Sequence, residues 1–333
     1  MTAETMPLLG KPGAASPSLF TSAISSAEGK RLPQTIAHRG DKAAYPENSM
    51  GAFRGAIEVG AHAIETDLHL SKDGVVVLSH DATLKRCFGI DKKIADCDWE
   101  YLSTLKTTRE PKQSMPRLSD LLEYIAQPGL ESRWLLLDIK VDDDGHDLLS
   151  RVASVLASVP TPRPWNERIV LGGWNENYLT LCRTLLPSFP IALIGFSPIY
   201  ASKFLSQPDV NFNMLQKTLV GPIGSRFIKA VRKSGRSLFL WTVNDEEWME
   251  WSIRKEADGV ITDDPKLFLE VCERDSGEEG AEGKVLSRRG KGRRALRVVK
   301  LYLGAFCLQV VAFVLMAFFA GRLTGLGRRK EGR

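Results

Sequence analysis

Two carboxylates stand two residues apart in an apolar stretch of the sequence. Glu65 and Asp67 alternate with Ile64, Thr66 and Leu68, so in a β-strand both acids would point to one face. On a buried face, two neighbouring carboxylates would repel each other and be poorly solvated. They would need a cation, and a hard divalent metal with oxygen ligands is the natural partner. The pair therefore predicts a metal site, with a solvated strand end as the alternative.

Further ionisable residues follow other apolar runs. Asp138 comes after Trp134–Leu137 and would add a third carboxylate, with Lys140 two residues further on the same face. His38 and His80 each end a short apolar run, and imidazole can act as general acid or base near pH 7. A single histidine after a strand is more often structural. Acidic, basic and cation-binding groups arriving together at strand ends predict an active site.

The last two apolar runs end in polar groups whose roles stay open. Trp241 and Asn244 end one run, and Trp241 fits either a substrate platform or the core. Asp263 and Asp264 end the next, where they could serve the site or cap the helix expected at Pro265. The other histidines have no partner that the sequence identifies and are interpreted as surface or packing residues: His62, His69 and His146.

These residues need a scaffold that brings strand ends together. Eight strand-helix units over about 240 residues are typical of a (β/α)8 TIM barrel, an α/β fold whose active site lies at the carboxyl ends of the strands. A ninth strand, 75–79, follows an Asp-Gly turn and is expected to form a hairpin, before a long connection over 81–133. The predicted barrel strands are 34–38, 62–68, 134–139, 168–172, 191–195, 210–214, 237–243 and 258–262.

Composition excludes several classes of protein. The chain has 333 residues, of which 43% are hydrophobic and 26% charged, which is too apolar for a wholly disordered protein. The net charge of +5 comes from a basic region beyond Lys284, so the preceding domain is acidic and no nucleic-acid partner is expected. The five cysteines form no CxxC pair, which favours a reducing compartment.

The end of the chain predicts a membrane anchor. Residues 301–321 carry no charge, and as a helix they would span about 30 Å, the thickness of a bilayer's hydrocarbon core. Seven basic residues precede this segment and five follow it, which favours a cytosolic catalytic domain, with a shallow hairpin in one leaflet as the alternative. We expect a tail-anchored protein of an intracellular membrane: the endoplasmic reticulum, a lipid droplet or the mitochondrial outer membrane.

The predicted organisation has five parts. They are a disordered arm (1–31), the barrel (32–273), a charged flexible linker (274–300), a transmembrane or membrane-inserted helix (301–321) and a basic tail (322–333). The expected partner of the segment 301–321 is a phospholipid membrane.

The motifs from Ile36 to Pro265 resemble those of the glycerophosphodiester phosphodiesterases. The shared motifs are His38-Arg39-Gly40, Tyr45-Pro46-Glu47-Asn48, Glu65-Thr66-Asp67, Asp73-Gly74, His80-Asp81, Asp138-Ile139-Lys140, Trp241-Thr242-Val243-Asn244 and Ile261-Thr262-Asp263-Asp264-Pro265. The resemblance implies a barrel fold and dependence on a divalent metal, Mg²⁺ or Ca²⁺. It also implies catalytic roles for His38 and His80, and metal ligands at Glu65, Asp67 and Asp138.

The remaining site residues are assigned by hypothesis. Arg39 and Lys140 are expected to bind phosphate, while Glu47, Asn48, Trp241 and Asn244 would support the site or contact substrate. Many relatives have Glu where this chain has Asp138, which leaves the choice of metal open. Asp138-Ile139-Lys140 and the C-terminal apolar segment look most like the fungal phosphatidylglycerol phospholipase C branch.

The resemblance therefore implies a glycerophospholipid substrate, and the expected activity is cleavage of phosphatidylglycerol to diacylglycerol and glycerol phosphate at a membrane surface. The alternatives are a phosphodiesterase for glycerophosphodiesters or lysophospholipids, a phospholipase D-like cleavage, and an inactive membrane scaffold. A scaffold is disfavoured because both histidines and all three carboxylates are present.

Overall fold

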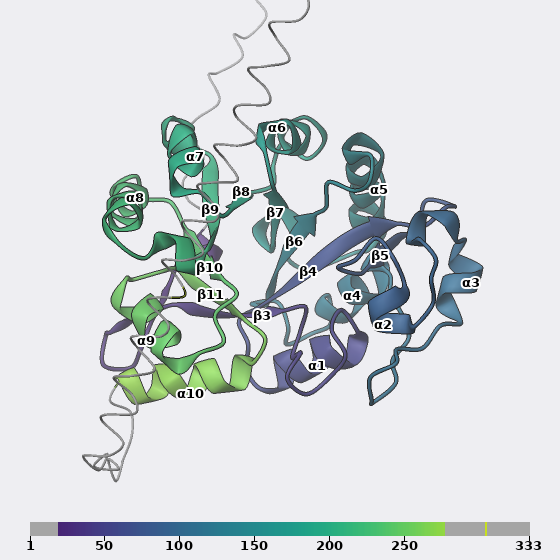
Figure 1. Cartoon of the computed structure of the whole chain (residues 1–333), viewed down its shortest axis with the longest axis horizontal. Helices are drawn as coiled ribbons and strands as arrows, with labels where there is room; N and C mark the ends of the chain where they lie inside the picture. Colours follow the sequence, from purple (N-terminus) through teal and green to yellow (C-terminus); the bar gives the residue numbers. More distant parts are fainter. Residues whose placement is uncertain (1–18, 277–303, 305–333) are drawn as a thin grey trace, which may run out of the picture.

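Parallel strands close into a barrel in the computed structural model, which describes residues 19–276 and Gly304 (Figure 1). Each strand pairs with its neighbours, and the first pairs with both the last and the second, which closes the ring. The predicted eight-stranded barrel is confirmed for the described residues. Its strands are β3 (Gln34–His38), β4 (Ala63–Leu70), β6 (Trp134–Ile139), β7 (Ile169–Gly173), β8 (Ile191–Gly195), β9 (Val210–Leu215), β10 (Leu238–Trp241) and β11 (Gly259–Thr262).

The predicted hairpin is also confirmed. Strand β5 (Val76–Leu78) pairs antiparallel with the end of β4, which therefore extends beyond the barrel. The long connection that follows folds into short helical pieces that form a side lobe on the right of Figure 1. These pieces are α2 (Lys85–Phe88), η2 (Ile94–Asp96) and α3 (Trp99–Ser103). They pack around their own apolar cluster, which includes Leu84 and Leu102.

Helices surround the barrel (Figure 1). Several begin at residues whose side chains cap the first turn: Ser49 accepts a hydrogen bond from the Ala52 N–H, and Asn175 accepts one from Tyr178. The longer helices are α1 (Met50–Glu58), α4 (Leu118–Ile125), α5 (Gly145–Ser158), α6 (Glu176–Leu185), α8 (Pro222–Lys233), α9 (Glu246–Arg254) and α10 (Pro265–Ser276). Shorter elements are α7 (Pro198–Ser202), η3 (Trp165–Glu167), η4 (Lys203–Ser206) and η5 (Gln216–Leu219).

The barrel interior is apolar at one end and charged at the other. On β6, Trp134 and Leu136 point inward near the amino end, and the same alternation places Asp138 inward near the carboxyl end. Trp134 packs against Phe239 with ring centroids 5.6 Å apart. This packing fills the lower interior, where Gln34 accepts the Trp134 side-chain N–H at 2.7 Å, and the buried carboxylates lie at the carboxyl ends of the strands.

The N-terminal arm is not disordered throughout. Its described part forms η1 (Leu19–Thr21) and a small hairpin of β1 (Ile24–Ser25) and β2 (Arg31–Leu32). Phe20 packs edge-on against Trp134, and its backbone carbonyl accepts a hydrogen bond from Gln34 at 2.7 Å. The segment is ordered because it covers the amino end of the barrel. Its composition does not predict this order.

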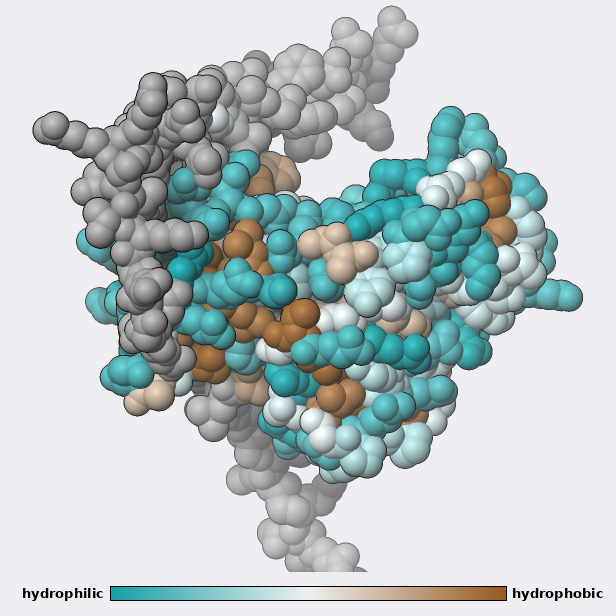
Figure 2. Space-filling view, turned by 90° about the horizontal axis from the view of Figure 1, so that it is seen from below, coloured by the Kyte–Doolittle hydropathy of each residue, from teal (hydrophilic) through white to brown (hydrophobic). Residues whose placement is uncertain are grey.

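The predicted membrane segment, 301–321, lies outside the described residues apart from Gly304. Among the residues that the structure describes, no helix combines the length and apolar character needed to cross a bilayer. Figure 2 shows one side of the molecule, on which hydrophilic residues predominate and hydrophobic side chains gather over the left and centre. The anchor and the domain boundaries remain predictions.

His62 makes the fold sensitive to acid. The Thr35 backbone N–H donates to His62 Nδ1 at 3.0 Å, a bond that requires an unprotonated nitrogen. Burial, followed by the charge of Arg133, lowers the pKa of His62 from 6.5 to about 4. The unfolded chain therefore binds this proton at a higher pH than the folded chain does, and stability is lost as the pH falls from about 6.5 towards 4.

We expect the wild-type protein to lose about 1–2 kcal/mol more unfolding free energy between pH 7.5 and pH 5 than a His62→Asn variant. The asparagine carbonyl can accept the Thr35 bond without titrating. Urea unfolding at both pH values measures the difference. Equal losses in the two proteins would show that His62 does not govern acid sensitivity.

Candidate active site

Three buried carboxylates meet at the carboxyl ends of neighbouring strands. Glu65 and Asp67 lie on β4, and Asp138 stands opposite Asp67 in the β4–β6 register. One carboxylate oxygen of each residue lies within 4.8 Å of the others. The i, i+2 spacing thus places both β4 acids on the same side as the β6 acid, as the sequence predicted.

Asp67 is the best neutralised of the three. Lys140 Nζ lies 2.6 Å from Asp67 Oδ1 and 2.6 Å from Asp138 Oδ2, and Arg39 Nε lies 3.1 Å from Asp67 Oδ2. Burial alone would raise the pKa of Asp67, but the charges of Lys140 and Arg39 outweigh it and hold this pKa well below its ordinary value. Asp67 is therefore ionised.

The charge of the Glu65 carboxylate is less well neutralised. Its Oε2 accepts the Arg39 backbone N–H at 3.2 Å and lies 3.9 Å from His38 Nε2. Burial, and then the charge of Asp67, raise the pKa of Glu65 well above its ordinary value. Burial also raises the pKa of Asp138, although Lys140 opposes this. The cluster thus holds more carboxylates than its neighbouring cations neutralise, and three oxygen ligands with this excess fit a hard divalent cation.

The loop after β3 is built to approach this cluster closely. Gly40 has φ +85°, and a Cβ there would come within 2.6 Å of the Ala52 carbonyl carbon, so only glycine fits. Asn48, at φ +49°, donates from Nδ2 to Asp67 Oδ2 at 2.9 Å and accepts from Thr66 Oγ1 at 2.8 Å. Asn48 thereby fixes the orientation of the Asp67 carboxylate.

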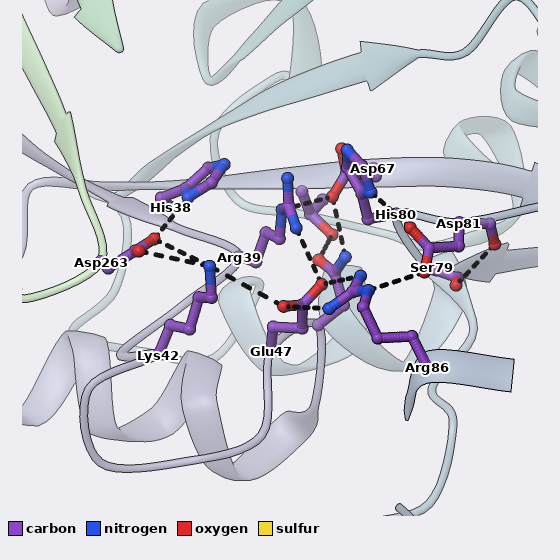
Figure 3. A network of polar contacts seen from close by, with 12 residues as sticks. His38, Arg39, Lys42, Glu47, Asp67, Ser79, His80, Asp81, Arg86 and Asp263 are labelled. Atoms are coloured by element: carbon purple, nitrogen blue, oxygen red, sulfur yellow. Dashed lines mark hydrogen bonds and ion pairs between the residues drawn. The ribbon is translucent and has the colours of Figure 1, made fainter. Parts of the chain in front are cut away.

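His38 is held by a carboxylate that is distant in the sequence but follows β11, the strand paired with β3. Its Nδ1 lies 2.6 Å from Asp263 Oδ1, and Figure 3 shows the two side chains facing each other. Lys42 and Asn244 also contact Asp263, at 3.2 and 2.9 Å from its Oδ2. Burial lowers the pKa of His38, and the Asp263 hydrogen bond partly offsets this. Nε2 is the nitrogen that faces the carboxylate cluster.

His80 is held in the same manner from the other side of the site. Its Nδ1 lies 2.7 Å from Asp81 Oδ1 (Figure 3). Arg86 donates to Asp81 at 2.7 Å and to both oxygens of Glu47 at 2.7 and 2.8 Å. Glu47 also accepts from Arg39 at 2.8 Å, so one network runs from the His80 loop to the carboxylates. Burial raises the pKa of Glu47, but the bonds from Arg86 and the charge of Arg39 lower it to about 2.

Most of the residues predicted from the sequence come together at this site. Their roles remain predictions: His38, His80, Glu65, Asp67, Asp138, Arg39, Lys140, Glu47, Asn48 and Asn244. Trp241 is half-buried at the carboxyl end of β10. Its N–H donates to the Asn213 carbonyl at 3.1 Å, and its ring centroid lies 5.9 Å from that of Trp174. Asp264 is a helix cap, since it accepts the Leu267 N–H at 2.9 Å.

Sequence reasoning missed several supporting residues. Trp174 donates to Asp138 Oδ1 at 2.7 Å, and its position directly after β7 was an available signal. His69, interpreted as a packing residue, is buried with Nδ1 2.7 Å from Asp143 Oδ2 and Nε2 3.3 Å from the His80 carbonyl. Its i, i+2 relation to Asp67 placed it on the site face. Lys42 lies in a loop and Arg86 in the short helix α2, and neither gave a periodic signal.

The glycerophosphoryl diester phosphodiesterase family model matches residues 38–267, which include all the carboxylates and both histidines described above. The chain belongs to this family. It is therefore a phosphoric diester hydrolase, and its acidic triad agrees with the divalent-metal dependence of the family.

Individual relatives agree with this assignment. A glycerophosphodiester phosphodiesterase of Caldanaerobacter subterraneus subsp. tengcongensis is 28% identical over 248 residues, covering 71% of this chain and 96% of its own. A lysophospholipase D of Rattus norvegicus is 26% identical over 277 residues, covering 72% of this chain and 86% of its own.

Solved structures share the fold. The glycerophosphodiester phosphodiesterase of Thermotoga maritima superposes with a TM-score of 0.58 and 26% identity, covering 72% of this chain and 98% of its own. An Oleispira antarctica phosphodiesterase, solved in complex with its product sn-glycerol-3-phosphate, gives a TM-score of 0.64 at 21% identity and covers 73% and 97% of the two chains. The phospholipase C relationship is not among these findings.

Replacing Asp263 by Asn should lower kcat about 10²-fold without unfolding the protein, because Asn can no longer hold the Nδ1–H form of His38 as a carboxylate does. Steady-state kinetics on a glycerophosphodiester and a thermal melt measure the two effects. Asp264→Asn is the matched control, since Asn caps a helix as well as Asp does. Equal activity of the Asp263→Asn and Asp264→Asn variants would show that Asp263 does not orient His38.

Proposed function

We propose that this enzyme hydrolyses glycerophosphodiesters and lysophospholipids, leaving the phosphate on the glycerol. The observation that carries the proposal is the meeting of three buried carboxylates and two carboxylate-oriented histidines at one end of the barrel. Support for the substrate class comes from the glycerophosphodiester phosphodiesterase and lysophospholipase D activities named for its relatives.

A common chemical feature unites these substrates. Each carries a free glycerol hydroxyl two carbons from the phosphate ester oxygen. Attack of the glycerol hydroxyl oxygen on phosphorus would form a five-membered cyclic phosphate and break the bond between phosphorus and the oxygen of the other alcohol. Water would then open the ring. Because attacking and attacked atoms belong to one molecule, this route gains the advantage of proximity.

The two histidines would transfer the protons. With each Nδ1–H donated to its carboxylate, the Nε2 of His38 or His80 is available to take the proton of the attacking hydroxyl. The other histidine would donate a proton to the departing alcohol oxygen. Their roles would reverse when water opens the ring.

Cations of the chain would share the phosphate charge. Arg39 and Lys140 both contact Asp67 and lie where a phosphate near the triad would meet them. Glu65, Asp67 and Asp138 would hold the divalent cation, which when bound would neutralise charge on a phosphoryl oxygen. Asn48 and Trp174 keep two of these carboxylates in place.

Phosphatidylglycerol is a second candidate substrate. Its head-group glycerol carries the required hydroxyl, and cleavage would release diacylglycerol and glycerol phosphate. Support comes from Asp138-Ile139-Lys140 and from the uncharged segment 301–321, both of which resemble the fungal phosphatidylglycerol phospholipase C branch. A membrane-anchored enzyme would be confined to the surface that holds this lipid.

The test uses the purified full-length chain with glycerophosphocholine, lysophosphatidylcholine and phosphatidylglycerol vesicles, each with Mg²⁺ or Ca²⁺. We expect turnover of the first two, loss of activity with a chelator, and at least about 10³-fold lower kcat in His38→Gln. Diacylglycerol from the vesicles would support the second candidate. A glycerophosphodiester whose glycerol lacks the 2-hydroxyl should be inert. Failure of all three substrates with either metal would contradict the proposed function.

A further inference from the structure

The rim of the active-site end is divided into two unlike halves. The loops after β3, β5 and β11 carry the charged network of Lys42, Glu47, Arg86 and Asp263. The segments after β6 to β9 instead expose apolar side chains. Among residues 19–276, the exposed large hydrophobic residues all lie here: Val141 (53% exposed), Phe196 (46%), Ile199 (53%) and Ile223 (59%).

Three of these residues form one patch. Phe196 directly follows β8, and Ile199 and Ile223 occupy the first turns of α7 and α8. Helices α7 and α8 pack against each other and are neighbours on the left of Figure 1. Because these segments follow parallel strands, their first residues lie at the carboxyl ends of the barrel strands, which is the end that holds the carboxylates.

The patch is also basic. Residues 191–226 contain three basic residues, Lys203, Lys217 and Arg226, and a single acidic residue, Asp209. Asp209 precedes β9 at the opposite end of the barrel and is paired with Arg183. Lys203 and Arg226 are exposed and lie in the same segments as the apolar residues. We call Phe196, Ile199 and Ile223 with these two basic residues the rim patch.

We propose that the rim patch docks the catalytic end of the barrel onto an anionic lipid surface. Apolar side chains flanked by lysine and arginine suit the boundary of a bilayer, where the apolar groups enter and the cations meet anionic head groups. Val141 differs, since exposed Asp142 and Asp144 follow it and would be repelled by the same surface.

The length of the chain beyond the barrel is compatible with this docking. Helix α10 begins after β11 at the active-site end, and its 12 residues rise about 18 Å towards the other end. Twenty-four residues, 277–300, then precede the uncharged segment that begins at Leu301. Fully extended, they could span up to roughly 80 Å, so a membrane-inserted 301–321 would leave the rim patch able to reach the same bilayer.

Hydrogen–deuterium exchange of the full-length chain tests docking independently of activity. Vesicles containing phosphatidylglycerol should protect residues 196–203 and 217–226, while residues 141–147 exchange as before. A triple variant (Phe196→Asn, Ile199→Asn, Ile223→Asn) should lose this protection. Val141→Asn, which removes an equally exposed apolar side chain on the same end, should keep it. Equal protection of residues 141–147, or none in the rim patch, would overturn the proposal.

Kinetics separate docking from substrate binding. The triple variant should hydrolyse lysophosphatidylglycerol in vesicles at least tenfold more slowly than wild type, with glycerophosphocholine turnover within twofold and an unchanged melting temperature. Loss of both activities in the folded variant would instead place these residues in the substrate site and overturn docking. Docking rests on the proposed function only in this kinetic assay, because the exchange experiment does not require hydrolysis of a diester. Protection without turnover of any diester would refute the function alone, and turnover without protection would refute docking alone.

Discussion

The structure of the site depends on neutralising three carboxylates that are buried at the mouth of the barrel. Water cannot solvate them there, and their mutual repulsion raises the pKa of Glu65. Lys140 bridges Asp67 and Asp138, and Arg39 reaches Asp67 through a strained turn at φ +59°. These two cations only partly offset the effects that raise the pKa of Glu65. The cluster therefore keeps an excess of carboxylates, which a divalent ion would neutralise.

The barrel places the packing that stabilises it at the amino ends of the strands and the reactive groups at the carboxyl ends. Trp134, Phe239 and Phe20 fill the amino end of the interior, where Gln34 accepts the Trp134 side-chain N–H at 2.7 Å. The same inward face of β6 becomes polar only at Asp138 and Lys140. Each histidine is then oriented by its own carboxylate, His38 by Asp263 and His80 by the adjacent Asp81, which leaves the two Nε2 atoms free for proton transfer.

Local periodicity was enough to predict the barrel and the meeting of the three carboxylates. Alternation within one strand places Glu65 and Asp67 on one face, and strand ends converge in any parallel barrel. Partnerships across the fold could not be predicted in this way. His38 and Asp263 are 225 residues apart in the sequence. The sequence also does not show that Asp264 caps a helix while the adjacent Asp263 contacts His38. Phe20 was likewise missed because its partner, the open amino end of the barrel, exists only after folding.

A titration of the full-length chain with Mn²⁺, followed by electron paramagnetic resonance, would show whether the acidic triad binds a metal ion. We expect one ion bound per wild-type chain and affinity weakened by at least about 100-fold in Glu65→Gln, which keeps the shape of the side chain but removes its charge. Asp264→Asn should bind as wild type does. Equal affinity of Glu65→Gln and wild type would show that the ion is held elsewhere.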